Sequence, residues 1–175
     1  GIYELEMGGC LRELVVDLAG ADDVKAVQVG GSTGSIVPGH MLDIPLAHET
    51  CLGSGAVVVL SSKRDVIDAI YNNMRFLNDE SCGKCTPCRD GTEAMLEILD
   101  RLRRADGRED DIESMEALAK AMADASLCGL GQAAAVPVLD SLKYFREEYI
   151  DRIEQSLYLR SYLGAEIAKT KEVVG

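Results

Sequence analysis

The sequence lacks any long hydrophobic run and is short of basic residues. A membrane-spanning helix needs roughly 20 consecutive apolar residues, whereas the longest apolar runs, such as residues 56–60, have only the length of a strand. With 18 Lys and Arg against 30 Asp and Glu, the formal net charge is −12. Nucleic acids are bound through basic side chains that neutralise phosphates. We therefore expect neither membrane insertion nor nucleic-acid binding.

The sequence also lacks a secretory signal pattern, an initiator Met and, apart from His40 and His48, any histidine. We interpret both histidines as surface residues, because they lie in loop-like sequence with no serine or cysteine nucleophile motif beside them. An opening at Gly1, directly in strand-like sequence, indicates the middle of a longer polypeptide. Without a signal, the six cysteines predict metal binding rather than a disulfide framework. The predicted location is cytoplasmic, or peripheral to a membrane complex.

Hydrophobic residues make up 47% of the 175 positions, which is enough for a globular chain with one or two small cores. The first third alternates between short apolar runs and Gly-containing turns. Its periodicities predict a strand at 2–7, a helix at 10–18, a strand at 25–29, a Gly-rich loop at 30–39 and a strand within 53–60. The loop matches neither phosphate-binding fingerprint, so we interpret it as a structural turn. This order suits a small α+β domain.

From residue 62 onward the hydrophobic period becomes that of a helix. The successive apolar stripes cover residues 66–77, 95–102, 112–122 and 138–145, and helical character continues over 157–163. Gly107 separates the second stripe from the third. The pattern predicts a helical bundle with short connections. The predicted domain boundary falls near Ser61–Ser62, which divides the chain into residues 1–61 and 62–175.

Four of the six cysteines form a pattern that is typical of an iron–sulfur site. Cys82, Cys85 and Cys88 form a C-x₂-C-x₂-C run, which commonly supplies three of the four thiolates of a cuboidal cluster. Cys128 is the candidate fourth ligand. Two predicted helices with a turn between them separate it from Cys88, so the chain can return to the same end of the bundle. The sequence therefore predicts a [4Fe–4S] site on these four residues.

The expected helix ends favour the same site. We expect the second helix to begin just after Cys88 and the fourth to begin after Cys128. Helix N-termini present unpaired N–H groups and partial positive charge, which stabilise an anionic cluster. Lys84 and Arg89 would add local positive charge in an otherwise acidic chain.

The spacing of these cysteines fits a zinc site, disulfides or free thiols less well than an iron–sulfur cluster. Structural zinc sites usually take two ligands from each of two separate C-x₂-C pairs, whereas here the division is three plus one. Disulfides or free thiols are the remaining alternative. Cys10 and Cys51 have no partner spacing, and we interpret them as small thiols that are buried or half-exposed. No residue pattern indicates a catalytic nucleophile or base.

Two long motifs resemble a known family. Residues 80–91 (ESCGKCTPCRDG) and 126–132 (SLCGLGQ) closely resemble the flavin- and NADH-binding subunit of respiratory complex I, and the related subunits of NAD(P)-linked hydrogenases and formate dehydrogenases. Residues 11–18, 26–31 and 53–56 look like the ubiquitin-like β-grasp domain of that subunit. The resemblance covers nearly all of residues 1–170.

The resemblance implies a β-grasp domain followed by an all-α four-helix bundle that holds one [4Fe–4S] cluster. Cys82, Cys85, Cys88 and Cys128 fall on the four ligands of the family. There the cluster accepts electrons from FMN, which NADH has reduced, and passes them to a cluster in a neighbouring subunit. The domain that binds FMN and NADH is not part of this sequence. The chain is therefore expected to need a flavin- and NADH-binding domain or subunit as a partner, and not to oxidise NADH alone.

Three functions follow as hypotheses. The leading one is an electron-transfer module that relays electrons from a reduced flavin to the next redox centre of an NADH:acceptor oxidoreductase. The second is a module stapled by structural zinc. The third is a β-grasp module that binds a soluble ligand or partner, which rests on analogy of fold alone. The parent complex, whether respiratory, hydrogenase or formate dehydrogenase, is left open by the sequence.

Overall fold

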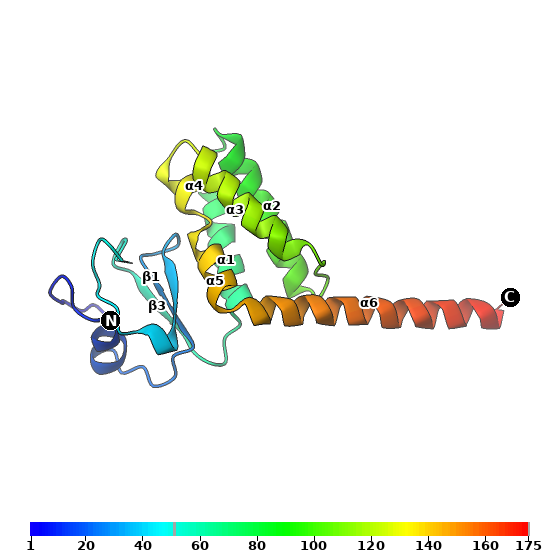
Figure 1. The fold of residues 1–175 in the computed structure, drawn as a ribbon, viewed down its shortest axis with the longest axis horizontal. Coiled ribbons are helices and arrows are strands. Elements are labelled where there is room, and N and C mark those ends of the chain that lie inside the picture. The colour runs from blue at the N-terminus through cyan, green and yellow to red at the C-terminus, as the bar shows by residue number, and fades with distance from the viewer. Residues whose placement is uncertain (51, 175) are drawn as a thin grey trace.

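A computed structural model describes residues 1–50 and 52–174, with side chains through residue 162. A small sheet lies at one end and helices form the rest (Figure 1). The strands are β1 (Ala26–Val29), β2 (Ser35–Pro38) and β3 (Val57–Leu60). The α-helices are α1 (Val66–Asp79), α2 (Thr86–Arg103), α3 (Asp111–Ala125), α4 (Gly129–Ala133), α5 (Val136–Tyr144) and α6 (Arg146–Val174). A π-helix, η1 (Glu13–Leu18), and a 3₁₀ turn, η2 (Gly39–Met41), complete the described elements.

The sheet is antiparallel, with β1 between β2 and β3. Ala26 pairs with Pro38 on one side and with Leu60 on the other. Because side chains alternate across a strand, Val27 and Val29 join a core with the η1 segment, whereas Ala26 packs into the core of the helices. The predicted strands at 25–29 and within 53–60 are thus confirmed. The central strand is buried on both faces.

The Gly-rich segment at 30–39 holds a strand that we predicted as loop. The glycines lie before and after that strand, and Gly30 and Gly31 take positive φ angles of 100° and 87°. Residues 35–38 pair with β1 as β2. Ile36 packs against the helices, and its burial favours a strand here. The many glycines of the segment gave no indication of this burial in the sequence.

The strand predicted at residues 2–7 is wrong. The segment has no regular structure, and Ile2, Tyr3 and Met7 are exposed. A strand is stable only when its backbone groups pair with a neighbour. Within the described part of the chain, the pairing near this end is a single bridge between Cys10 and Pro45.

The helix predicted at 10–18 is present, but most of it is a π-helix. Ala19 N–H donates to Leu14 C=O at 3.0 Å, a spacing of five residues. Leu11 and Val15 are buried as expected, whereas Leu18 is exposed. A π-helix has more residues per turn than the 3.6 of an α-helix. The apolar side chains spaced for an α-helix therefore rotate out of line, and Leu18, the last of them, points away from the core.

The predicted helical stripes of residues 66–77, 95–102 and 112–122 lie on α1, α2 and α3, and they supply most of the larger core. The predicted fourth helix is divided into α4 and α5. Pro137 stands in the first turn of α5, where its missing N–H costs no hydrogen bond. The described residues therefore form six α-helices, and the long α6 extends away from the body (Figure 1).

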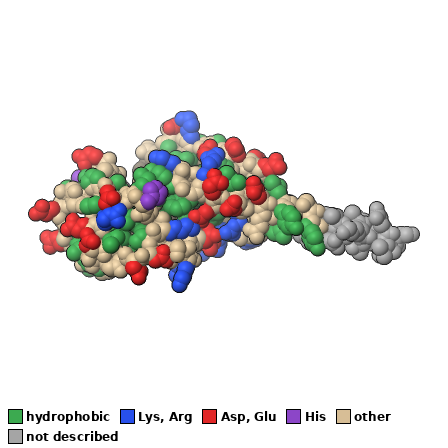
Figure 2. Space-filling view, turned by 60° about the horizontal axis from the view of Figure 1, so that its bottom comes forward, with side chains coloured by type: hydrophobic (Ala, Val, Ile, Leu, Met, Phe, Trp, Pro, Cys, Tyr) green, Lys and Arg blue, Asp and Glu red, His purple; other side chains and the backbone are tan. Residues whose placement is uncertain are grey.

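The surface is predominantly acidic. Figure 2 shows Asp and Glu side chains spread over the visible face, with fewer Lys and Arg between them. Among the described helices, none is both long enough and apolar enough to cross a membrane.

Candidate metal centre

The connection between α1 and α2 carries the three closely spaced cysteines. Cys85 occupies the N-cap position of α2, and Pro87 lies in its first turn. The helix thus begins at Thr86, before Cys88 rather than after it as we predicted. Proline has a fixed φ and no N–H, so it starts a helix well at this position. Cys88 consequently lies inside the first turn and is buried, whereas Cys82 is exposed.

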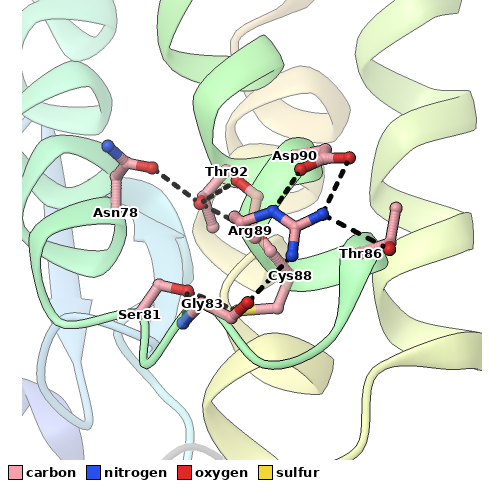
Figure 3. Close-up of polar contacts among 8 residues, drawn as sticks. All are labelled: Asn78, Ser81, Gly83, Thr86, Cys88, Arg89, Asp90 and Thr92. Carbon is pink, nitrogen blue, oxygen red and sulfur yellow. Dashed lines mark hydrogen bonds and ion pairs between the residues drawn. The ribbon is translucent and has the colours of Figure 1, made fainter.

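Arg89 and Ser81 both form hydrogen bonds with the backbone of Gly83, in the connection between α1 and α2 (Figure 3). Arg89 Nη1 donates to Gly83 C=O at 2.9 Å, and Gly83 has a φ of 72° that favours glycine. Gly83 N–H donates to Ser81 Oγ at 3.4 Å, and Ser81 Oγ lies 3.3 Å from Cys88 Sγ. Arg89 also pairs with Asp90 at 2.7 Å, so part of its predicted positive charge is neutralised.

A second set of contacts joins the end of α1 to the start of α2. The buried Thr92 hydroxyl lies 2.8 Å from Cys88 C=O and 2.9 Å from Asn78 Oδ1 (Figure 3). The single Thr92 hydroxyl proton can bond either oxygen, and its contact with Cys88 C=O helps to fix the backbone of Cys88. Our sequence analysis missed Asn78 and Thr92, because a bond between residues 14 positions apart depends on how two helices pack.

The second cysteine segment lies between α3 and α4. Cys128 is the N-cap residue of α4, which confirms the prediction that a helix begins after it. Its side chain is exposed. Gln132 Nε2 donates to Ser126 C=O at 3.0 Å, and this bond closes the turn.

The two segments meet at Gly131 and at Cys85. A Cβ atom on Gly131 would lie 2.8 Å from Cys88 Cβ and 2.6 Å from Ser126 Oγ, so α4 packs directly against the first turn of α2. The pKa of the Cys85 thiol is lowered, chiefly because Leu127 N–H points at its sulfur and next because Cys88 N–H does. Burial acts in the opposite direction.

The structure brings the two segments together without closing all four thiols around one point. Within the described residues, no three Cys, His, Asp or Glu side chains are close enough to hold one metal ion. Cys10 lies away from the site, where its Sγ contacts Leu42 C=O at 3.5 Å. Cys51 falls outside the described residues. His40 and His48 are exposed, as predicted.

The donor set and its surroundings fit an iron–sulfur cluster. The four candidate ligands are soft thiols, and two of them stand at helix N-termini, where free N–H groups favour an anionic group. The Ser126 Oγ atom is buried and, within the described part of the chain, has no hydrogen-bond partner. A buried hydroxyl without a partner is rare in proteins, and a sulfur-rich group beside it would supply one.

Comparison with known proteins identifies the family. Residues 68–152 match the model of the NADH-ubiquinone oxidoreductase-F iron–sulfur binding region. Residues 68–152 belong to this family. The family supports a [4Fe–4S] cluster as the cofactor, as predicted from the cysteine pattern.

Individual relatives cover more of the chain. It is 35% identical to the NADP-reducing hydrogenase subunit HndC of Solidesulfovibrio fructosivorans, over 85% of this chain and 32% of the relative. It is 37% identical to the mitochondrial NADH dehydrogenase (ubiquinone) flavoprotein 1 of Dictyostelium discoideum, over 87% of this chain and 34% of the relative. The chain thus spans about a third of the length of the curated relatives that it matches.

A solved structure shares the fold over almost the whole chain. The NAD⁺-reducing [NiFe]-hydrogenase in the H₂-reduced state aligns with a TM-score of 0.83 at 31% sequence identity. The alignment covers 98% of this chain and 31% of the hydrogenase chain. Both the sheet and the helices therefore have counterparts in that protein.

Proposed function

We propose that this chain is an electron-transfer module that holds one [4Fe–4S] cluster on Cys82, Cys85, Cys88 and Cys128. The observation that carries the proposal is the contact between the two cysteine segments. A Cβ on Gly131 would meet Cys88 Cβ at 2.8 Å and Ser126 Oγ at 2.6 Å, although Gly131 lies 43 positions after Cys88 in the sequence. This contact supports Cys128 as the fourth ligand, because α4, which Cys128 caps, packs against the first turn of α2.

The chain's own residues would bind and orient the group. When bound, the cluster supplies a centre that accepts and releases one electron. Arg89 and Gly83 hold the first segment in shape, and Gln132 holds the second. The lowered pKa of Cys85 favours its thiolate, the form that ligates iron. These features prearrange the donors, so that less conformational freedom is lost when the cluster binds.

The proposed electron path needs partners. We propose that a separate flavin- and NADH-binding domain or subunit reduces the cluster, and that a neighbouring iron–sulfur subunit accepts the electron. The end of the bundle is open to such partners, because Cys82 and Cys128 are exposed and Leu127 is 76% exposed. The names of the relatives, a hydrogenase subunit and an NADH dehydrogenase flavoprotein, support this assignment. On this proposal the chain alone does not oxidise NADH.

We also propose the finer division of the fold. Residues 1–61 would form a β-grasp unit, supported by the mixed sheet-and-helix core around Val15 and Val27. Residues 62–175 would form a four-helix bundle of α1, α2, α3 and α5, with α4 as the ligand-bearing turn. The shared core of these four helices supports the second assignment.

The decisive experiment is metal and sulfide analysis of the full chain after anaerobic preparation, with an EPR spectrum of the dithionite-reduced sample. We expect about four irons and four acid-labile sulfides per chain, with a fast-relaxing S = 1/2 signal. One zinc without sulfide, even after reconstitution, would replace the electron-transfer proposal with the zinc-stapled module.

Substitution of single cysteines tests the ligand set. Cys128→Ala should lower the iron content and the Tm of the loaded chain, because the cluster then no longer joins α4 to α2. Without a cluster, the free energy of unfolding of the variant should differ from that of wild type by less than about 0.5 kcal/mol, since Cys128 is exposed. Cys10→Ala is the matched control and should retain full iron. Wild-type iron and an unchanged Tm in loaded Cys128→Ala would remove Cys128 from the ligand set.

A further inference from the structure

Two serine hydroxyls lie beside the cysteines and have no other assigned role. We propose that Ser81 and Ser126 are positioning residues that donate hydrogen bonds to the sulfurs of the site and thereby raise the reduction potential of the cluster. The proposal rests on the proposed function, since it requires that a cluster is bound. Ser81 comes from the α1–α2 connection and Ser126 from the end of α3, so the two hydroxyls reach the site from different segments.

The direction of the Ser81 contact follows from its partners. Ser81 Oγ accepts the N–H of Gly83 at 3.4 Å, and it lies 3.3 Å from Cys88 Sγ (Figure 3). In the cluster-free chain either Ser81 or Cys88 could supply the proton between them. A cysteine that ligates iron carries no proton. Ser81 must then be the donor, and its hydroxyl proton points at the Cys88 sulfur.

The Ser126 hydroxyl is buried at the contact between the two cysteine segments. The residue is 6% exposed, and its backbone groups are already bonded, the N–H to Met122 C=O at 3.1 Å and the C=O to Gln132. Only the hydroxyl is left, and it closes no hydrogen bond among the described residues. A Cβ on Gly131 would touch both Ser126 Oγ and Cys88 Cβ, so the hydroxyl lies close to the first turn of α2, which carries Cys88. The described cysteine sulfurs form no hydrogen bond with this hydroxyl, so the acceptor that we assign to it is a sulfur of the bound cluster.

The sign of the effect follows from charge. The reduced cluster carries one more negative charge than the oxidised cluster, so a hydrogen bond to a sulfur stabilises the reduced form more strongly. Removing either hydroxyl should shift the oxidised-to-reduced ratio at a fixed potential about three- to tenfold toward the oxidised form. A tenfold shift corresponds to about 59 mV for a one-electron couple.

The test is a potentiometric titration of the full, cluster-loaded chain, followed by EPR. Ser81→Ala and Ser126→Ala should each lower the midpoint potential, while iron and sulfide stay at wild-type levels. Ser81→Thr keeps the hydroxyl and should restore the potential. The control is Ser141→Ala, which removes a buried hydroxyl in α5 that lies 2.7 Å from Tyr149 Oη on α6. This control should lower stability and leave the potential unchanged.

The outcomes separate the two proposals. Absence of iron and sulfide from the wild-type chain contradicts the proposed function. Fully loaded alanine variants whose potentials equal that of wild type overturn the serine proposal and leave the electron-transfer function standing. If Ser126→Ala loads no cluster, the Ser81→Ala variant provides the test, because Ser81 is only partly buried. An unshifted potential in that variant overturns the proposal.

Discussion

Gly131 is the residue at which the two cysteine segments come into contact. It lies on α4, and any side chain there would meet Cys88 Cβ at 2.8 Å and Ser126 at 2.6 Å. Real Cβ atoms do not approach that closely, so the neighbours would have to shift. Gly129 lies on the same short helix and has open space around its missing side chain. The two glycines thus differ in packing alone.

We predict that Gly131→Ala pushes α4 away from the first turn of α2. The overpacking should destabilise the chain by about 1–3 kcal/mol and reduce the iron bound per chain. Gly129→Ala should bind iron like wild type and change stability by less than about 1 kcal/mol. Urea unfolding and iron analysis of both variants provide the measurement. Equal iron content in the two variants would contradict the packing argument.

At the scale of elements, hydrogen bonds at Ser156 and Arg160 anchor the long α6 to the connection between α2 and α3. Ser156 Oγ accepts from the buried Gly107 N–H at 3.0 Å and donates to Arg152 C=O at 2.7 Å. Ile153 packs into the larger core beside it. This first half of α6 is therefore part of the bundle, although Tyr158 and Tyr162 are exposed.

We predict that Ser156→Ala lowers the free energy of unfolding by about 1–3 kcal/mol, because Gly107 N–H would stay buried without a partner. Ser161→Ala serves as the control, since among the described residues this exposed serine bonds to Tyr158 C=O of its own helix. It should change stability by less than about 0.5 kcal/mol. Similar losses in both variants, measured by denaturant unfolding, would show that α6 is not anchored at Gly107.

At the scale of the whole molecule, polar contacts join the sheet to the helices. Asp140 on α5 accepts the N–H of Ile36 at 3.0 Å, which attaches the outer strand β2 to the bundle. Asn73 Nδ2 on α1 donates to the buried Gln28 Oε1 at 2.8 Å. Lys25 pairs with Glu148 at 2.9 Å. The sheet is thus held to the helices by directional bonds as well as by apolar packing.

Asp140 gives this interface a pH dependence. Burial raises the pKa of its carboxyl above 3.8, while the Ile36 N–H and the charge of Lys143 oppose the rise. The folded chain therefore keeps the proton at a pH where the unfolded chain has lost it. The stability that this group contributes is present at acid pH and is lost as the pH rises through the folded-state pKa.

We predict that Asp140→Asn has a larger free energy of unfolding than wild type near pH 7, because its amide oxygen still accepts from Ile36 N–H and no charge is buried. This difference in stability should be smallest near pH 4. Asp140→Ala leaves that N–H unpaired and should lose about 1–3 kcal/mol at either pH. Denaturant unfolding of the three proteins across this range is the measurement. A pH dependence in Asp140→Asn equal to that of wild type would refute the assignment.

Much of the helical part was predictable from local pattern. The stripes of α1, α2 and α3 lie where the 3.6-residue period places them, because each helix closes its own hydrogen bonds and needs only one apolar face. Strands were harder to predict. Residues 2–7 alternate like a strand but pair with no strand among the described residues. The glycines around β2 predicted a loop, whereas these residues form a strand because they pair with β1.

The sequence by itself determined which cysteines could act together, since C-x₂-C-x₂-C is a local pattern and Cys128 precedes a helix start. The tertiary structure alone decided how they meet. Gly131 lets α4 approach Cys88, and the Ser126 hydroxyl is buried without a hydrogen-bond partner among the described residues. These relations depend on the packing of helices that are distant in the chain, and periodicity reports which face a helix buries but not what that face meets.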